Sequence, residues 1–333
     1  MTTHDRGVTM PGPPRMSGRA RLLTGAGLVL GAVAVGFVVK TLVDSWPDVS
    51  EEIRTAEAAW LVAAAALAAL AMVSMAWNWR FVLRLLGVEA SARRVVPWYF
   101  VGELGKYLPG GIWPVVGRGE LARRNGVVRS RAYASVALSL AVLYLAAMFV
   151  AAAFLPFALS GGGFNPWMLC LIALPVGVWL LHHRVLERMV AFASRLAKRP
   201  INVEIPRWSD SLVLVARYVP TWLLVGTATW CVARSIDAGA SYPRVMFASV
   251  LSWIVGFLAV PVPSGAGIRE TVLYAASDLS KSVAVTTAVA ARLLFVAVDL
   301  LGAGIGAPLV GRRRSARGVS PADASDKGDT SAV

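Results

Sequence analysis

The sequence contains few charged residues, three histidines and two cysteines. Only 16% of its 333 residues are Asp, Glu, Lys or Arg, whereas an ordinary soluble domain has about 25%. Both cysteines, Cys170 and Cys231, lie inside apolar runs without another Cys or His at the spacing of metal ligands. Neither a disulfide framework nor a zinc site is therefore predicted. Because no nucleotide motif or nucleophile with a base is recognisable either, we expect no cofactor, no metal site and no enzymatic activity.

Hydrophobic residues make up 57% of the chain, above the roughly 45–50% of soluble domains. A bilayer core about 30 Å thick needs about 20 apolar residues per helix, and several runs reach that length. The first run is too long for a cleavable signal peptide and is interpreted as a signal anchor. Full spans are predicted at residues 22–43, 57–79, 132–158, 167–183, 215–235 and 282–309.

The expected fold is an all-α, polytopic membrane bundle of about six full spans, with two further segments that are broken by proline and glycine. Residues 20–310 form the predicted membrane domain. Residues 1–19 and 311–333 are rich in Pro, Gly, Ser, Arg and Asp and have little to bury, so we expect both termini to be disordered.

The net charge of +14 is attributed to basic cytoplasmic loops, not to nucleic-acid binding. Residues 80–131 contain ten Lys or Arg and residues 182–217 contain seven, whereas the connection 160–166 contains none. This alternation predicts that the N-terminus and the basic C-terminal tail are both cytoplasmic. It also favours re-entrant geometry for the broken segments 95–120 and 245–277. The first would enter the membrane from inside and return there, and the second would enter from outside and return there.

The two broken segments resemble each other. The segment PVVGRGE contains Pro114, Gly117, Gly119 and Glu120. The segment PVPSGAGIRE contains the matching residues Pro263, Gly265, Gly267 and Glu270, with one extra residue before the glutamate. Opposed broken helices are typical of inverted-repeat transporters, where half-helix N-termini attract anions near the midplane. The alternative is an amphipathic cytoplasmic loop followed, later in the chain, by a Pro-kinked ordinary helix.

Several ionisable residues lie in apolar segments, where placing a charge inside the membrane costs free energy. Arg292 and Asp299 are seven residues apart on one face of the last span, where they either line a transport path or stabilise helix packing through separate partners. Arg118 and Arg269 lie in the glycine-rich turns, where a guanidinium can fork onto a phosphate. Glu103 with Lys106, and Glu120 with Arg123 and Arg124, are at helical spacing and can neutralise each other without a ligand, and a structural role is favoured for Glu103.

The segments GKYLPGGIWPVVGRGE and PVPSGAGIRE, on a scaffold of this length, resemble the lysylphosphatidylglycerol synthase transmembrane, or flippase-like, family. The resemblance covers about residues 22–309 and implies a bacterial or archaeal membrane protein related to a lipid-flipping domain. In the two-domain synthases that domain is coupled to a soluble aminoacyltransferase. Only residues 311–333 follow the last span here, so we expect no lipid aminoacylation by this chain. The resemblance implicates Lys106, Pro109, Gly110, Arg118, Gly119, Glu120, Pro263, Gly265, Gly267, Arg269 and Glu270.

The expected function is movement of a phospholipid or a lipid-linked cell-envelope precursor between the leaflets of a bacterial plasma membrane. The alternatives are a secondary transporter of a small anion and a non-transporting scaffold for a cell-envelope enzyme. The expected partners are a phosphate-bearing headgroup and a separate synthase or glycosyltransferase, but no nucleic acid. Candidate substrate-binding residues are Lys106, Arg118, Glu120, Arg269, Glu270, Arg292 and Asp299. Candidate structural residues are Pro109, Gly110, Gly111, Pro114, Gly117, Gly119, Pro263, Gly265 and Gly267.

Overall fold

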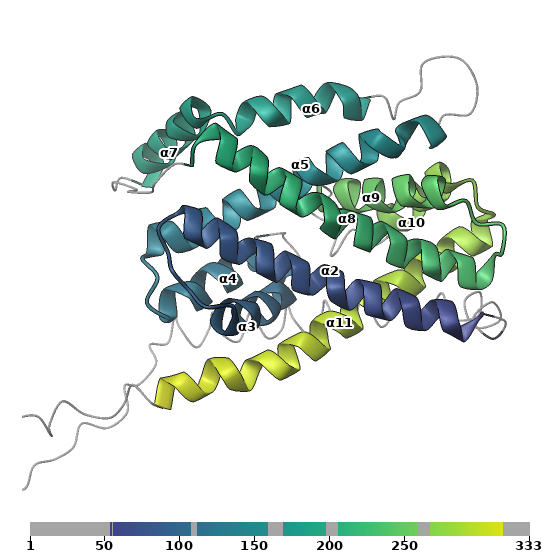
Figure 1. Cartoon of the computed structure of the whole chain (residues 1–333), viewed down its shortest axis with the longest axis horizontal. Helices are drawn as coiled ribbons and strands as arrows, with labels where there is room; N and C mark the ends of the chain where they lie inside the picture. Colours follow the sequence, from purple (N-terminus) through teal and green to yellow (C-terminus); the bar gives the residue numbers. More distant parts are fainter. Residues whose placement is uncertain are drawn as a thin grey trace, which may run out of the picture.

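The structure, a computed structural model, describes residues 54, 56–107, 112–158, 169–197, 206–258 and 267–315. Every regular element within these residues is a helix (Figure 1). The predicted span 22–43, the N-terminal segment and the tail beyond Ser315 lie outside the described residues. The helices are α2 (Ala58–Leu85), α3 (Ala92–Glu103), η1 (Leu104–Tyr107), α4 (Trp113–Arg124), α5 (Arg129–Ala158), α6 (Leu169–Leu180), α7 (His183–Ala197), α8 (Trp208–Ile236), α9 (Tyr242–Leu258), α10 (Ile268–Ser277) and α11 (Lys281–Ser315).

Four helices of the described part are long and apolar enough to cross a membrane: α2, α5, α8 and α11. Each has at least 28 residues, and at about 1.5 Å per residue this exceeds the thickness of the hydrocarbon core. The predicted all-α membrane bundle is confirmed. Helix α6 contains 12 residues of the predicted span 167–183, which is about 18 Å of helix, and residues 167 and 168 lie outside the described residues. Helix α11 continues to Ser315, beyond the predicted end of the membrane domain at residue 310.

The long helices α2 and α8 pack antiparallel, since the Glu57 amide before α2 donates to the Ser235 carbonyl near the end of α8 at 3.0 Å. Further along, the Asn78 side chain donates to the Arg217 carbonyl at 3.0 Å. A buried amide with a backbone partner keeps its hydrogen bonds satisfied inside the bundle. This pair therefore sets the register of the two helices around which the broken segments assemble.

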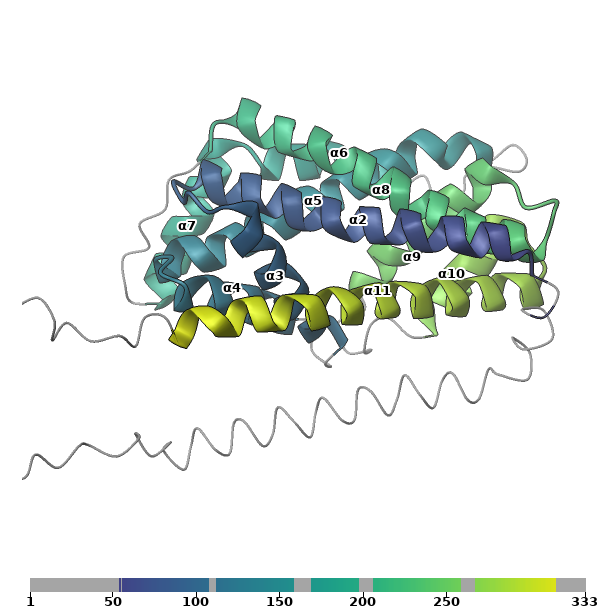
Figure 2. The same cartoon turned by 60° about the horizontal axis from the view of Figure 1, so that its bottom comes forward.

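Both broken segments form helical hairpins. The first consists of α3, η1 and α4, and the second of α9 and α10, with the two helices of each pair packed side by side. Hairpin 1 begins where α2 ends, and hairpin 2 begins where α8 ends. Because α2 and α8 are antiparallel, the hairpins enter the bundle from opposite ends, and each lies beside one half of α11 (Figures 1 and 2).

Helix α11 packs against hairpin 1 along a face of small residues. An added Cβ at Gly302 would overlap the Phe100 ring of α3, and one at Gly306 would lie 3.1 Å from Pro97 Cα. The absence of side chains at these glycines lets α3 approach α11 closely, as small residues do between membrane helices. The predicted polar and small face of the last span therefore packs against protein, and it leads directly to the ionisable residues between the hairpins.

Candidate functional site

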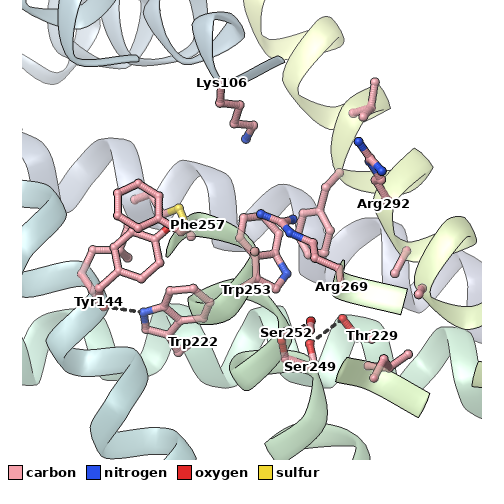
Figure 3. A pocket seen from close by; sticks show the side chains of 18 of the residues that line it. Lys106, Tyr144, Trp222, Thr229, Ser249, Ser252, Trp253, Phe257, Arg269 and Arg292 are labelled. Carbon is pink, nitrogen blue, oxygen red and sulfur yellow. Dashed lines mark hydrogen bonds between the residues drawn. The ribbon is translucent and has the colours of Figure 1, made fainter. Parts of the chain in front are cut away.

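A cavity of about 120 Å³ lies between the two hairpins and is also lined by α5, α8 and α11. Its acidic and basic lining residues are Glu103, Lys106, Arg269, Glu270 and Arg292. Figure 3 shows Lys106, Arg269 and Arg292 around the same space, each carried by a different element. Three cations are thus gathered inside the bundle by segments that are far apart in the sequence.

Arg269 of hairpin 2 lies across a glycine of the neighbouring helix. A Cβ at Gly256 would lie 2.6 Å from Arg269 Nε and 2.8 Å from its Cγ, so only glycine leaves room for this side chain. The guanidinium lies over the Trp253 ring, 4.2 Å from its centroid, in a cation–π contact. No carboxylate of the described residues lies within 4 Å of it, and its buried Nε has no hydrogen-bond partner there.

Arg118 of hairpin 1 is placed in a similar way but is paired. A Cβ at Gly102 would lie 2.7 Å from Arg118 Cγ, and the guanidinium lies 5.1 Å from the Tyr99 ring centroid. Arg118 Nε is 3.3 Å from a carboxylate oxygen of Glu103, and the arginine is only 1% exposed. Arg118 does not line the cavity. The structure places this candidate behind Glu103, where its charge is already compensated.

The two hairpins therefore share one local arrangement. In each, an arginine of the second helix lies over a glycine of the first, and over an aromatic residue three positions before that glycine: Tyr99 and Gly102 in hairpin 1, Trp253 and Gly256 in hairpin 2. Residues three apart lie on the same helix face, which explains why the spacing recurs. The predicted similarity of the segments thus has a structural counterpart, although it runs through Gly102 and Gly256, which the sequence comparison did not select.

Helix α11 supplies one residue to each hairpin. Arg292 Nη1 lies 3.6 Å from Glu270 of hairpin 2. Asp299, which is fully buried, contacts hairpin 1: Lys106 Nζ lies 2.6 Å from Oδ2, and the Tyr107 hydroxyl donates to the same oxygen at 2.6 Å. Arg292 lines the cavity, which agrees with the alternative of a transport path. Asp299 does not line it and holds η1 against α11, which agrees with the alternative of helix packing.

Glu120 lies near the C-terminal end of α4, away from the cavity lining. It accepts hydrogen bonds from Arg123 and Arg124 at 2.7 Å, as the helical spacing predicted. These two guanidinium groups hold the pKa of Glu120 at about 2. Glu270, its match in the sequence comparison, does line the cavity. The difference arises because Glu120 is two residues after its arginine and Glu270 is one, and each step along a helix rotates the side chain by about 100°.

The prolines and glycines predicted to have a structural role lie at different positions in the fold. Pro114 lines the cavity at the start of α4, and a Cβ at Gly117 would lie 2.7 Å from the Gly102 carbonyl oxygen. A Cβ at Gly119 would meet the Tyr133 ring at 2.9 Å. Gly267 has a φ of 80° immediately before α10, a conformation that favours glycine. Pro109, Gly110, Gly111, Pro263 and Gly265 lie outside the described residues.

Sequence reasoning missed the hydroxyl and aromatic lining of the cavity. The Ser252 hydroxyl donates to the Ser249 carbonyl at 2.7 Å, and the Ser249 hydroxyl donates to Thr229 at 2.9 Å. Trp222 and Trp253 contact each other with ring centroids 5.9 Å apart. The sequence feature that could have indicated these hydroxyl groups is a pair of serines three residues apart inside an apolar segment, because this spacing places both on one helix face. No three metal-ligating side chains gather anywhere in the described helices.

The fold and the cavity define a class of protein: a multi-pass α-helical membrane protein whose two opposed hairpins enclose a charged, aromatic-lined site. Residues 25–306 match the family described as the lysylphosphatidylglycerol synthase TM region, and the chain belongs to that family. The match supports a lipid-related role in the membrane. None of the curated proteins matches the chain.

Proposed function

We propose that this protein is a lipid flippase of the bacterial plasma membrane, with both termini in the cytoplasm, and that it is a transporter and not an enzyme. Its substrate is a phosphate-bearing lipid whose headgroup enters the cavity between the hairpins. The observation that carries the proposal is Arg269, a cation that lines the cavity without a carboxylate within 4 Å among the described residues.

The energetics of a buried charge favour an anionic ligand at this position. A charged side chain in the middle of a bilayer costs at least about 2.5–3.5 kcal/mol, and a guanidinium is compensated best by a carboxylate or phosphate that accepts two hydrogen bonds. The other cavity cations, Lys106 and Arg292, have acidic partners at 2.6 and 3.6 Å. Arg269 is therefore the first cation that we expect a phosphate to contact.

The geometry also suits movement across the membrane. The hairpins enter from opposite ends of the bundle (Figure 2), so a headgroup between them is near the middle of the long helices. Lys106 and Arg292 bridge the hairpins and α11 through ion pairs. A phosphate that takes one of these cations from its partner weakens the corresponding bridge. We expect this exchange to loosen one hairpin at a time, with the driving force supplied by a gradient or by downstream consumption of the lipid.

Reconstitution into liposomes tests the proposal. Vesicles that contain the full-length chain and an acyl-labelled phospholipid are treated with a membrane-impermeant quencher, and the rate at which inner-leaflet label becomes accessible is measured. We expect faster exchange than in protein-free vesicles. Arg269→Gln removes the charge and leaves a shorter, neutral polar side chain, and it should slow exchange by at least about tenfold, because a hydrogen bond to a charged group contributes about 1.5–3 kcal/mol.

The matched control is Arg124→Gln, which alters an arginine that is about half exposed and pairs with Glu120. It should exchange lipid at the wild-type rate. If no lipid class moves faster than in empty vesicles while the vesicles take up labelled phosphate or sulfate, the protein is a small-anion transporter. If neither moves and Arg269→Gln leaves the membrane lipids of the cell unchanged, a scaffold for a separate synthase or glycosyltransferase is the better account.

A further inference from the structure

Among the described helices, the charged residues around the cavity leave one positive charge without a carboxylate partner, and their hydroxyl neighbours have acceptor oxygens that remain available. We infer from these two features, resting on the proposed function, that the preferred headgroup carries a net charge of −1 and ends in an uncharged polyol. The chemical class is a phosphodiester lipid whose head bears hydroxyl groups, as distinct from a zwitterionic or an aminoacylated lipid.

The charge balance follows from the pairing of each cation. Three cations have acidic partners, Lys106 with Asp299 at 2.6 Å, Arg118 with Glu103 at 3.3 Å and Arg292 with Glu270 at 3.6 Å. Four cations and three carboxylates make a net charge of +1 for this cluster, and the excess is carried by Arg269. Residues 108–111 and 259–266, which connect the helices of the two hairpins, contain no ionisable side chain, so they do not change this balance.

A buried site binds best a ligand that cancels its charge, because a surplus charge of either sign has to be taken out of water without compensation. A phosphodiester with a neutral head brings one negative charge and balances the cluster. A zwitterionic head brings a phosphate and an ammonium, and the ammonium finds each of the three carboxylates already paired. An aminoacylated lipid brings still more positive charge, and a phosphomonoester brings more negative charge than Arg269 balances.

The hydroxyl groups under Arg269 specify the rest of the head. The Ser252 hydroxyl donates to the Ser249 carbonyl, the Ser249 hydroxyl donates to Thr229, and the Thr229 hydroxyl donates to the Val225 carbonyl at 3.1 Å. Each proton is therefore used inside the protein, while a hydroxyl oxygen keeps lone pairs that can accept. Ser249, Ser252 and Thr229 all line the cavity. A group that donates hydrogen bonds without carrying a charge fits them, and a polyol provides such groups.

The aromatic lining completes this site. Trp253 lies 4.2 Å from the Arg269 guanidinium and contacts Trp222 and Phe295 edge to face. Figure 3 shows Trp253 between Arg269 and Trp222, with Ser249 and Ser252 nearby. Apolar and aromatic walls with a few directed polar groups are typical of small-molecule sites. We therefore place the phosphate at Arg269 and the polyol beside Trp253 and the two serines.

A panel of four acyl-labelled lipids separates charge from hydroxyl recognition in the liposome assay: phosphatidylglycerol, phosphatidylmethanol, phosphatidylethanolamine and lysyl-phosphatidylglycerol. Phosphatidylmethanol has the same net charge as phosphatidylglycerol but no free hydroxyl. We expect phosphatidylglycerol to exchange fastest. Phosphatidylmethanol should exchange about tenfold more slowly, because roughly one hydrogen bond is lost and its partner in the protein is left unpaired. Phosphatidylethanolamine and lysyl-phosphatidylglycerol, which carry an ammonium group, should exchange more slowly still.

Two variants test the residues directly. Phe257→Glu places a carboxylate where hairpin 1 carries Glu103, and it should reduce the preference for phosphatidylglycerol over phosphatidylethanolamine. Ser252→Ala should remove the preference for phosphatidylglycerol over phosphatidylmethanol while the preference over phosphatidylethanolamine remains. Thermal unfolding in detergent identifies any variant that does not fold, and Arg269→Gln, which adds no new charge, provides the same test of charge selectivity if Phe257→Glu fails to fold.

The possible results distinguish this inference from the proposed function. If all four lipids exchange at equal rates above those of empty vesicles, the protein is a flippase and the headgroup inference is overturned. It is also overturned if an ammonium-bearing lipid is fastest, or if Ser252→Ala and Phe257→Glu leave the relative rates of the four lipids unchanged. If no lipid is accelerated, the proposed function itself fails.

Discussion

Phe257 in hairpin 2 occupies the position that Glu103 occupies in hairpin 1, because each directly follows the glycine against which the arginine of its hairpin lies. Glu103 forms an ion pair with Arg118 at 3.3 Å, whereas the Phe257 ring stacks on Tyr144 with a centroid distance of 4.1 Å. One hairpin thus neutralises its arginine and the other does not. This difference separates an arginine with a carboxylate partner from one that has no carboxylate within 4 Å among the described residues.

Glu103→Gln should destabilise the protein. It leaves Arg118, which is 1% exposed, without its charged partner inside the bundle, and removing one member of a buried ion pair costs about 3–5 kcal/mol. Equilibrium unfolding in mixed detergent measures the change. An unfolding free energy equal to that of the wild type would contradict the structural role assigned to this pair.

Gly256→Ala should block transport while the helices remain folded. The new Cβ would lie 2.6 Å from Arg269 Nε, so the arginine has to leave its place over Trp253. We expect at least about a tenfold loss of lipid exchange, comparable with the loss of a charge-assisted hydrogen bond. Gly304→Ala is the control, because no atom lies within 4 Å of its added Cβ. Equal activity of the two variants would show that the position of Arg269 does not matter.

Asp299→Asn should loosen η1 from α11. The carboxylate holds both Lys106 and the Tyr107 hydroxyl at 2.6 Å, and the substitution removes the shorter of the two acidic contacts of Lys106, the other being Glu103 at 3.9 Å, at an expected cost of up to about 3–5 kcal/mol. The double variant Asp299→Asn with Lys106→Met removes both charges and should regain part of that stability. A double-mutant cycle of unfolding free energies measures the coupling, and strictly additive effects would contradict a direct pair.

Glu120→Gln should have a small effect on stability and none on transport, because its ion pairs lie at an exposed end of α4 and such pairs contribute little. Since Arg123 and Arg124 lower the pKa of Glu120 to about 2, the contribution of the carboxylate is complete above its ordinary pKa and disappears as the pH falls through about 2. The stability difference between wild type and variant should therefore shrink on acidification. A difference that grows would contradict the assigned pairs.

Prediction from sequence succeeded where the physical signal is local. The spans 57–79, 132–158, 215–235 and 282–309 correspond to long helices, because hydropathy and length are properties of a continuous segment. The shared face of Arg292 and Asp299 was also predicted correctly, since helical periodicity determines which residues lie on one side. The breaks in the two hairpins were indicated by their proline and glycine content.

The structure brings only some of the candidate site residues together. Lys106, Arg269, Glu270 and Arg292 do meet at one cavity, whereas Arg118, Glu120 and Asp299 do not line it. Matching the motifs by their glycines and glutamates made Glu120 and Glu270 equivalent, but a one-residue difference turns them to different sides of their helices. The serines and tryptophans of the cavity carried no charge signal that would separate them from ordinary membrane-helix residues.

The sequence by itself determined that this chain is a helical membrane protein with two broken, arginine-bearing segments, because the bilayer demands long apolar helices and penalises charge wherever it occurs. Only the tertiary structure decided which charges remain available. Pairing depends on distances between residues on neighbouring helices, such as Gly102 with Arg118 and Gly256 with Arg269. Those distances are produced by the packing of the two helices of each hairpin against one another and against α11, and no local pattern in the chain records them.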